Sequence, residues 1–509
     1  MSSRLTSHLQ GRTLVLVSNR EPYEHVAAAP GEAPNVRRPP GGLVSALDPT
    51  MQATRGVWVA WGSGSGDRDA ADADGRVGVP PEAPRYTLRR VWLDGDDVEG
   101  YYQGFANSVL WPLCHLLVQH YQFREAWWAR YQAVNARFAE AAAEEAARAA
   151  GAPVVWVQDY HLALAPRLLR EALAARCPEA ARRLAVHQFW HIPFPPPDLL
   201  ALLPPGVPQA LLGGLLGNDL VAFHTDRHAA NFLDAVAAFI PDATVRREHG
   251  LVRVGPPGAE RTTRVGAFPI SVDVDHYEGL ARDAAAEADA ARARYAPGGR
   301  RLVLSVDRVD YTKGIPERLR ALDRLFETAP ELLGTVTAVL VATPSRDEIP
   351  AYQTLTQEVV DGVAALNARW AAPGWTPVVL EHRNVPAREL AALYRAADVA
   401  LVSSLQDGMN LVAKEFVACQ LDERGVLVLS RQAGAAEELE GAVFITPFDV
   451  DGFAAGVRDA LAMPAAERSA RMAAMRAALR QATVFDWLDA VLGRAAELAP
   501  TGESAGAGA

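Results

Sequence analysis

The chain of 509 residues is poor in cysteine and lacks long apolar runs. Its three cysteines, Cys114, Cys177 and Cys419, are odd in number and lack metal-ligand spacing, which indicates reduced thiols. No apolar stretch is long enough to cross a bilayer, and the first residues, MSSRLTSHLQGR, lack the hydrophobic core of a signal peptide. We therefore expect a soluble cytoplasmic protein with no membrane partner.

An excess of positive charge is also missing, because the formal net charge is -11. This balance argues against nucleic acid as a partner, and any anion site must be a local basic pocket. No Cys-x2-Cys pair occurs, and we expect neither a metal ion nor a cofactor. The spacing of a Walker phosphate loop is absent, and the serines of GSGSG (62–66) lie in a predicted loop with no following helix, so a serine nucleophile is not supported.

Short apolar strands, each followed by a polar turn and a helix, alternate along most of the chain. They are expected at 13–18, 57–61, 154–158, 184–190 and 219–224, and again at 301–306, 337–343, 377–381, 398–403 and 425–430. This alternation is typical of βαβ units with a parallel sheet. We predict an α/β fold with two doubly wound, Rossmann-like domains facing a central cleft.

The expected boundaries divide the chain into four parts. Residues 1–266 form an amino-terminal domain and residues 267–480 a carboxy-terminal domain. The helix at 481–498 is expected to pack back on the first domain, and the tail at 499–509 to be disordered. Ligands of open α/β sheets bind outside the carboxyl ends of the strands, so the residues just after each strand are the candidates.

The stretch 401–415, LVSSLQDGMNLVAKE, carries the most informative local pattern. An apolar strand stops at a polar turn containing Asp407 and Gly408, and an amphipathic helix begins near Asn410. Such a turn presents unpaired backbone N–H groups and the positive end of a helix, which suits a diphosphate. Glu415 would lie about one turn into the helix, within reach of sugar hydroxyls on the same ligand.

Basic residues follow three other predicted strands. Arg308 and Lys313 lie just past one strand, and together they suit a diphosphate. Two isolated basic residues would more often be a solvated surface pair, but their position opposite the Gly408 turn favours the diphosphate. Arg20 and Arg346 each follow a strand, one in either half, and could hold a second anionic group or form surface ion pairs. Position alone does not decide between these two roles.

Two further groups of residues could line a site. Asp159 and His161 lie in QDYHL, and the prolines after His191 in HIPFPPP would hold its imidazole in place, but a structural histidine is an equal alternative. The aromatic run YYQGFANSVLW contains Tyr102 and Trp111 and could form either core or a sugar-stacking wall.

Together these pieces resemble the trehalose-6-phosphate synthase family, retaining glycosyltransferases of family 20 with the two-domain GT-B fold. The resemblance runs from Leu14 to the terminal helix. Its motifs are VSNR (17–20), GGL (41–43), YYQGFANSVLWP (101–112), QDYHL (158–162), HIPFP (191–195), DRVDYTKGIPER (307–318), TPSR (343–346), WTPV (375–378) and DGMNLVAKEF (407–416).

The resemblance implies a role for each candidate residue. Arg20 and Arg346 would bind the phosphate of the acceptor, glucose 6-phosphate, while Tyr102, Trp111 and Asp159 would shape the pocket for its sugar. The implied catalytic residues are His191, Asp407, Arg308 and Lys313. The implied donor-binding residues are Gly41, Gly42, Arg308, Lys313, Val385, Asp407, Gly408, Leu411, Val412, Ala413, Lys414 and Glu415.

The implied activity is transfer of glucose, with retention, from a nucleotide-glucose to glucose 6-phosphate. UDP-glucose is the first choice and GDP-glucose the alternative. Gln158 and Gln406 stand where the family commonly has His and Arg, and both flank the pockets. Alternatives are a glucosylglycerol-phosphate synthase, another family transferase with a different phosphorylated acceptor, or a non-catalytic sugar-phosphate sensor. A homodimer or homotetramer is compatible with the resemblance, and a separate trehalose-phosphate phosphatase is expected to act downstream.

Overall fold

A computed structural model describes residues 7–28, 35–39, 42–346 and 348–498. Two of the expectations above, the role of Gly41 and the tail at 499–509, lie outside the described residues. The chain divides into two compact units. Unit 1 contains the residues up to Pro269 and those from Phe485 onward, and unit 2 is Ile270–Val484.

Unit 1 is built on a ten-stranded sheet in the order β10-β11-β12-β9-β8-β7-β1-β4-β6-β5. All neighbours from β12 to β6 pair in parallel, whereas β10, β11 and β5 add antiparallel edges. The strands are β1 (Arg12–Arg20), β4 (Val57–Trp61), β5 (Arg76–Val79), β6 (Tyr86–Val91), β7 (Ala152–Gln158), β8 (Ala185–Phe189), β9 (Leu220–Phe223), β10 (Ala243–Arg246), β11 (Leu251–Val254) and β12 (Arg261–Ala267). A separate hairpin pairs β2 (Glu24–Val26) with β3 (Asn35–Arg37).

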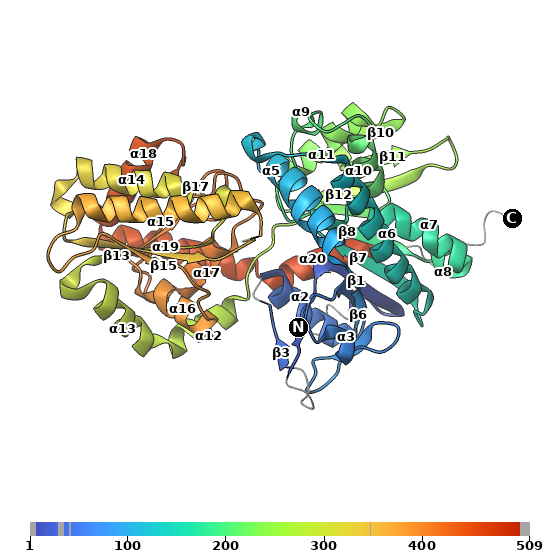
Figure 1. The fold of residues 1–509 in the computed structure, drawn as a ribbon, viewed down its shortest axis with the longest axis horizontal. Coiled ribbons are helices and arrows are strands. Elements are labelled where there is room, and N and C mark those ends of the chain that lie inside the picture. The colour runs from blue at the N-terminus through green and yellow to red at the C-terminus, as the bar shows by residue number, and fades with distance from the viewer. Residues whose placement is uncertain (1–6, 29–34, 40–41, 347, 499–509) are drawn as a thin grey trace. The chain divides into compact units, whose positions relative to one another are not determined.

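Helices connect the strands of unit 1, and the long helix α6 runs beside η1 (Figure 1). The α-helices are α2 (Gly42–Thr54), α3 (Asp67–Ala70), α4 (Gly95–Asp97), α5 (Trp111–Cys114), α6 (Glu125–Ala147), α7 (Ala165–Arg176), α8 (Pro178–Arg182), α9 (Pro197–Leu200), α10 (Val207–Leu215) and α11 (Asp226–Phe239). Residues Val98–Leu110 form a π-helix, η1, and short 3-10 turns are η2 (Val118–His120), η3 (Tyr160–Leu162) and η4 (Arg247–His249).

The last helix, α20 (Val484–Leu498), packs within unit 1 although the chain reaches it from unit 2. The ring of Trp487 lies 5.8 Å from that of Trp156 on β7 and 5.2 Å from that of Phe189 on β8. Asp489 accepts a hydrogen bond from His8 at 2.9 Å. Burial of Trp487, which is 3% exposed, therefore joins the end of the chain to the core of the first sheet.

Unit 2 contains a six-stranded parallel sheet in the order β15-β14-β13-β16-β17-β18. Its strands are β13 (Arg301–Arg308), β14 (Val336–Thr343), β15 (Val378–Glu381), β16 (Val399–Val402), β17 (Val426–Ser430) and β18 (Val443–Ile445). These strands are almost continuously apolar and buried because helices cover both faces of the sheet. In Figure 1, α14, α15 and α18 cover one face, and α12, α13 and α16 lie on the other.

The helices of unit 2 follow the strands in βαβ order, as predicted for a doubly wound domain. The α-helices are α12 (Val274–Asp283), α13 (Ala285–Tyr295), α14 (Ile315–Thr328), α15 (Pro350–Trp370), α16 (Ala387–Ala396), α17 (Leu411–Cys419), α18 (Val450–Ala462) and α19 (Ala465–Gln481). Short 3-10 turns are η5 (Pro297–Gly299), η6 (Tyr311–Lys313), η7 (Pro330–Leu332) and η8 (Gly434–Glu437). The predicted fold class, α/β with two Rossmann-like domains, is confirmed.

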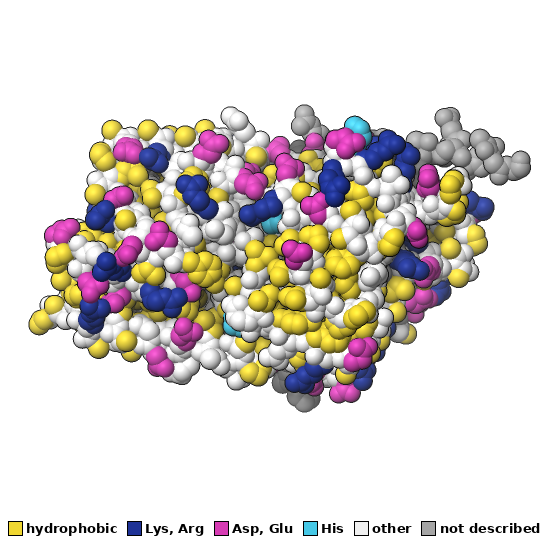
Figure 2. Space-filling model, turned by 90° about the horizontal axis from the view of Figure 1, so that it is seen from above, with side chains coloured by type: hydrophobic (Ala, Val, Ile, Leu, Met, Phe, Trp, Pro, Cys, Tyr) yellow, Lys and Arg dark blue, Asp and Glu magenta, His cyan; other side chains and the backbone are white. Residues whose placement is uncertain are grey.

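Charged side chains of both signs are intermixed over the face shown in Figure 2. Many of them form ion pairs on the surfaces of helices, such as Arg167 with Glu171 at 2.9 Å on α7. Within the described residues, no helix is both long and apolar enough to cross a membrane.

Candidate active site

Each sheet has one point at which the order of its strands reverses, and the candidate residues gather there. In unit 1 the chain winds outward from β1 to β4 and β6 and, on the other side, from β7 to β8 and β9. In unit 2 the reversal lies between β13 and β16. At such switch points, neighbouring loops leave in opposite directions and open a crevice for ligands. Arg20 and Asp159 flank the first point, and Lys313 and Asp407 flank the second.

Hydrogen bonds from neighbouring elements fix the carboxyl end of β1, where Arg20 lies. A register shift between Ser18 and Arg20 marks an irregularity in the strand. The hydroxyl of Ser18 accepts a bond from the Trp58 indole at 2.8 Å and donates to the Arg20 carbonyl at 2.7 Å. Asn19 accepts from the hydroxyl of Tyr101 at 2.9 Å. The guanidinium of Arg20 is thereby presented at the edge of the sheet on an exposed side chain.

The π-helix η1 brings the aromatic run to Arg20. Arg20 Nη2 donates to the hydroxyl of Tyr102 at 2.9 Å, and Tyr102 stacks on His161 with ring centroids 5.8 Å apart. Side chains support the wide helical turns, since Asn107 Nδ2 donates to the Tyr102 carbonyl five residues back at 2.7 Å. A Cβ at Gly104 would lie 2.5 Å from the Trp127 ring on α6, so only glycine permits this close packing. Tyr102 therefore lies between the guanidinium of Arg20 and the ring of His161.

Asp159 links the ends of β7 and β8. It adopts a left-handed backbone conformation with φ 68, and its Oδ1 accepts hydrogen bonds from the backbone N–H groups of Tyr160 at 2.9 Å and His191 at 3.1 Å. Gln188 Nε2 donates to the Asp159 carbonyl at 2.9 Å. A non-glycine residue with positive φ is uncommon and needs local support, which these bonds supply. Asp159 thus fixes the backbone that carries His191.

The imidazole of His191 is packed among rings. Its centroid lies 4.5 Å from that of Phe189 and 5.2 Å from that of His224. Burial lowers the pKa of His191 to about 3, so the ring is neutral at physiological pH. The Nε2 atom lies 2.9 Å from Oε1 of Gln158, an oxygen that can only accept. His191 therefore serves as a neutral hydrogen-bonding group and not as a cation.

Lys313 and Asp407 meet at the switch point of unit 2. Lys313 Nζ lies 2.5 Å from Asp407 Oδ2, and the two side chains are 13% and 14% exposed. The same Oδ2 atom accepts from Ser404 Oγ at 3.1 Å and from Asn410 Nδ2 at 3.1 Å. Lys313 follows β13 and Asp407 follows β16, so their contact joins two motifs nearly one hundred positions apart, as the two neighbouring strands require.

Asn410 is the N-cap of α17. Its Oδ1 accepts from the backbone N–H of Ala413 at 3.0 Å, and its backbone has φ 85. A cap of this kind satisfies one of the unpaired donors at the start of a helix and leaves others pointing outward. The turn before it is compact, because a Cβ at Gly434 would lie 2.2 Å from the Gly408 carbonyl oxygen. The predicted strand, turn and helix start at 401–415 are all present.

Contacts with the loop after β16 fix the turn that carries Lys313. Gly314 has φ +63, and a Cβ there would lie 2.3 Å from the Ser403 carbonyl oxygen, so glycine is required on both grounds. Arg318, 1% exposed, donates to Asp307 Oδ2 at 2.7 Å and to Ser403 Oγ at 3.1 Å. The loop after β13 and the loop after β16 are thereby fixed together.

Arg346 lies in the interior of unit 2, with its side chain only 6% exposed. Its Nη1 donates to Asp310 Oδ2 at 2.9 Å and also to the hydroxyl of Tyr352. Its backbone has φ 54, a strained conformation for arginine. Burial alone would raise the pKa of Asp310, but Arg346 and Arg308 hold it below its ordinary value. Arg346 is thus partnered by a carboxylate at the predicted acceptor-phosphate position.

The side chains of the first turns of α17 point in different directions. Glu415 accepts from the Tyr394 hydroxyl at 2.9 Å, and burial raises its pKa although Tyr394 and Tyr277 oppose the shift. Lys414 is fully buried, and its Nζ donates to the Ile270 carbonyl at 2.7 Å and to Glu438 at 2.6 Å. Only the backbone of Lys414 is therefore available to a ligand at the start of the helix.

The remaining predicted residues occupy the following places. Arg308 ends β13 with an exposed side chain, and Gly42 is the first residue of α2. Trp111 is 6% exposed and packs on the ring of Tyr160 at 5.7 Å, so most of it is core. Half-buried side chains are found at Val385, between β15 and α16, and at Leu411 and Val412, in the first turn of α17; Ala413 beside them is buried.

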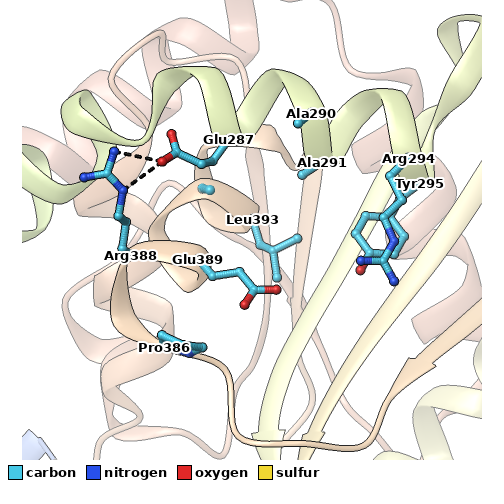
Figure 3. Close-up of a pocket in the computed structure, with 10 residues that line it drawn as sticks. Glu287, Ala290, Ala291, Arg294, Tyr295, Pro386, Arg388, Glu389 and Leu393 are labelled. Atoms are coloured by element: carbon cyan, nitrogen blue, oxygen red, sulfur yellow. Dashed lines mark hydrogen bonds and ion pairs between the residues drawn. The ribbon is translucent and has the colours of Figure 1, made fainter.

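A cavity of about 380 Å³ lies elsewhere, between α13 and α16 (Figure 3). Its charged rim is already paired, with Arg388 donating to Glu287 at 2.8 Å, and none of the predicted residues lines it. His187 and His191 stand four residues apart in the sequence, as do His224 and His228. Even so, among the residues that the structure describes, no group of three or more His, Cys, Asp or Glu could hold a metal ion.

The sequence did not indicate the roles of three residues that shape the site, although it placed the start of a helix near Asn410. Asp310 and Arg318 act through long-range contacts that leave no local signal. Asn410 carries one: an asparagine just before an amphipathic run is a typical N-cap. Gln158 was noted only as a departure from the family, yet its amide oxygen bonds the imidazole of His191.

The model of glycosyltransferase family 20 matches residues 12–497. The chain belongs to glycosyltransferase family 20. This membership confirms the predicted family and the predicted enzyme class, a retaining glycosyltransferase.

Relatives within family 20 are similar to this protein over nearly its whole chain. A trehalose-6-phosphate synthase of Mycobacterium marinum is 40% identical, with 96% of this chain and 94% of that protein covered. A bifunctional trehalose-6-phosphate synthase/phosphatase of Thermoproteus tenax is 39% identical over 93% of this chain, but the match spans only 62% of that longer protein.

A solved structure from Burkholderia xenovorans is similar in fold. It is a UDP-forming α,α-trehalose-phosphate synthase in complex with glucose-6-phosphate, and it superposes with a TM-score of 0.80 at 33% identity. The match covers 95% of this chain and 99% of that one.

Proposed function

We propose that the enzyme transfers glucose, with retention, from UDP-glucose to glucose 6-phosphate and so forms α,α-trehalose 6-phosphate. The observation that carries this proposal is that distant motif residues meet at one switch point in each unit. Arg20 contacts Tyr102 in unit 1, and Lys313 contacts Asp407 in unit 2. Similarity to a UDP-forming synthase in complex with glucose-6-phosphate supports both substrates.

Unit 2 is the proposed nucleotide-sugar domain. Its switch point offers the Lys313 ammonium, the exposed Arg308 and the start of α17, which together suit a diphosphate. Glu415 would accept from ribose hydroxyls, and Val385 would lie beside the base. Asp407, held by hydrogen bonds from Ser404 and Asn410, would accept from hydroxyls of the donor glucose.

Unit 1 is the proposed acceptor domain, extending to residue 266 with the final helix added. Arg20 would bind the acceptor phosphate, with Tyr102 holding its guanidinium in place. Tyr102, Asp159 and the exposed part of Trp111 would contact the acceptor sugar, and Arg346 of unit 2 would add a second guanidinium to the phosphate. Gly42, at the start of α2, and neutral His191 would face the donor.

Chemistry at this site would depend on stabilising the leaving group. Negative charge grows on the diphosphate as its bond to glucose breaks, so Lys313, Arg308 and the start of α17 stabilise the transition state more than the ground state. The Oδ2 of Asp407 already accepts three hydrogen bonds, which makes it a poor nucleophile. We infer that the leaving phosphate oxygen takes the proton of the acceptor hydroxyl on the same face of the sugar.

Two alternatives predict different products. A glucosylglycerol-phosphate synthase would share Arg20 and Arg346 but would accept glycerol 3-phosphate, whereas the Tyr102 and Trp111 rings favour a sugar. A non-catalytic sensor would need no donor residues, yet Arg308, Lys313, Asp407 and Glu415 are all present in the chain.

We also propose a cytoplasmic enzyme that assembles as a homodimer or homotetramer and passes its product to a separate phosphatase.

A matrix of substrates tests the proposal. The purified chain is incubated with UDP-, GDP- or ADP-glucose against glucose 6-phosphate or glycerol 3-phosphate, and the products are identified by mass spectrometry. We expect a disaccharide phosphate with glucose 6-phosphate and the highest rate with UDP-glucose. Turnover only with glycerol 3-phosphate would instead support a glucosylglycerol-phosphate synthase. No turnover with any pair of substrates would favour the non-catalytic sensor.

A further inference from the structure

Asp310 stands between the two basic residues of unit 2 that the proposed function assigns to different substrates. Its Oδ2 accepts from Arg346 Nη1 at 2.9 Å and from the Tyr352 hydroxyl at 3.2 Å. Its Oδ1 accepts from the backbone N–H of Thr312 at 3.0 Å and from Thr312 Oγ1 at 2.9 Å. One carboxylate oxygen of Asp310 therefore holds Arg346, on the proposed acceptor side. The other oxygen holds Thr312, in the turn of the proposed donor residue Lys313.

The donor side of this arrangement is the short turn η6. Asp310 is its N-cap, and its own carbonyl accepts from the backbone N–H of Lys313 at 3.0 Å. Thr312 and Asp310 are fully buried, so the turn cannot relax by exchanging these bonds for water. The direction in which Lys313 leaves the turn, toward Asp407, depends on that cap.

The side chains around Arg346, on the proposed acceptor side, are also buried. Arg346 Nη1 and the Tyr352 hydroxyl bond to each other and both bond to Asp310 Oδ2, forming a triangle whose members are almost fully buried. The guanidinium of Arg346 sits 5.3 Å from the centroid of the Tyr352 ring. Removal of the Asp310 carboxylate would therefore take an ion pair at 2.9 Å from a buried arginine whose backbone is already in an unusual conformation.

We propose that Asp310 is a positioning residue that couples two basic groups of unit 2, setting the guanidinium of Arg346 for the acceptor phosphate and the ammonium of Lys313 for the donor diphosphate. Because both substrates act on groups held by one rigid carboxylate, occupation of one site organises the other. The inference rests on the proposed function, since it uses the substrate classes assigned there. Asp310 itself touches neither substrate.

Side-specific variants separate the two roles. Tyr352→Phe removes the two hydroxyl bonds on the Arg346 side, to Arg346 and to Asp310, and leaves the η6 turn untouched. Thr312→Val removes the hydroxyl bond to Oδ1 and leaves Arg346 in place. Asp310→Asn can keep an oxygen toward Thr312 but then turns an amide donor toward Arg346, whose guanidinium has only donors, so the charged hydrogen bond between residues 310 and 346 is lost. Asp310→Ala removes both sides at once.

Equilibrium binding of UDP and of glucose 6-phosphate, each measured by calorimetry, gives the readout without requiring turnover. We expect Tyr352→Phe and Asp310→Asn to weaken glucose 6-phosphate about tenfold or more while UDP changes by less than about threefold, and Thr312→Val to do the reverse. Asp310→Ala should weaken both ligands, and it should abolish any increase in UDP affinity caused by glucose 6-phosphate.

Asp398 supplies a matched control, because it is a buried carboxylate of the same sheet with a similar set of partners. It is 5% exposed, accepts from the Leu302 backbone at 2.8 Å and pairs with Arg292 at 3.2 Å, but it precedes β16. Asp398→Asn should lower the melting temperature and leave both affinities unchanged.

The outcomes are distinct. Equal loss of both ligands in Asp398→Asn and Asp310→Asn would reduce the effect to general destabilisation and overturn the inference. Unchanged affinities in Asp310→Asn would overturn it as well. If the wild-type chain binds both ligands with the expected variant pattern but makes no disaccharide phosphate, the proposed function fails and the coupling stands. If the wild-type chain does not bind glucose 6-phosphate, both fail.

Discussion

Replacement of Lys313 by alanine tests the diphosphate site of unit 2. The Lys313 side chain is 13% exposed, and its ammonium lies 2.5 Å from Oδ2 of Asp407. Asp407 belongs to the turn that precedes α17. If it stabilises the leaving diphosphate, its removal deletes a charge-assisted hydrogen bond that is strongest in the transition state. A hydrogen bond to a charged group contributes about 1.5–3 kcal/mol, and about 1.4 kcal/mol changes a rate tenfold.

We therefore expect kcat of Lys313→Ala to fall about 10- to 150-fold. The KM for glucose 6-phosphate should stay within about threefold, because Arg20 and Tyr102 belong to the other unit and the variant leaves the bonds of Arg346 to Asp310 and Tyr352 unchanged. Steady-state kinetics with UDP-glucose measure both constants, and circular dichroism checks the fold.

Lys313→Met controls for volume and should be as impaired as the alanine variant, since the missing charge causes the loss. A double-mutant cycle with Asp407→Asn separates the contribution of Lys313 to the ligand from its contribution to Asp407. Unchanged kcat in Lys313→Ala, or a loss confined to the KM for glucose 6-phosphate, would refute the assignment.

Three other outcomes are expected. Arg20→Ala should raise the KM for glucose 6-phosphate about tenfold or more while the KM for UDP-glucose stays constant, because it removes a charged phosphate contact; equal changes in both constants would argue for a structural role. Glu21, buried beside Asp67 and paired with Arg90 at 2.8 Å, has its pKa raised to about 8 by burial. The folded chain therefore keeps a proton on Glu21 that the unfolded chain releases, so this stabilisation is fully present below about pH 4.5 and is lost as the pH rises through about 8. Urea unfolding should show a decline of up to about 1.4 kcal/mol per pH unit in this range, and Glu21→Gln should flatten it. His191, with a pKa of about 3, should give no inflection near pH 6.5 in the profile of kcat/KM, and such an inflection that disappears in His191→Asn would contradict a neutral ring.

The sequence was sufficient to predict which residues meet at the strand ends. Parallel strands bring their carboxyl ends to one edge, so Lys313 after β13 could be expected opposite the turn of Asp407 and Gly408 after β16. Most of the parallel strands of both sheets were also predicted, because buried parallel strands are nearly all apolar, but β6 and β18 were not among them.

Other features could not be predicted, because they depend on contacts between distant segments. The π-helix at Val98–Leu110 has an aromatic pattern that an α-helix would share, and its wide turns are supported by Asn107 and Ser108. The charged stretch 240–264, for which no strand was predicted, contains β10, β11 and the start of β12, because strands near the edge of a sheet need little apolar character.

Buried polar pairing also has no local signal. Nothing near Arg346 in the sequence indicates that its guanidinium is held by Asp310 and Tyr352, and Lys414 in the most informative motif points inward to Glu438. A motif thus indicated where a ligand binds more reliably than which of its side chains faces that ligand.

The most direct test of the proposed activity is the structure of the product formed from UDP-glucose and glucose 6-phosphate. Carbon-13 NMR of the reaction with UDP-[1-¹³C]glucose reports the configuration of the transferred anomeric carbon and the carbon to which it becomes linked. The account predicts an α,α-1,1 linkage with the phosphate retained on the acceptor ring. A β configuration at the labelled carbon, or transfer to any other hydroxyl of glucose 6-phosphate, would contradict it.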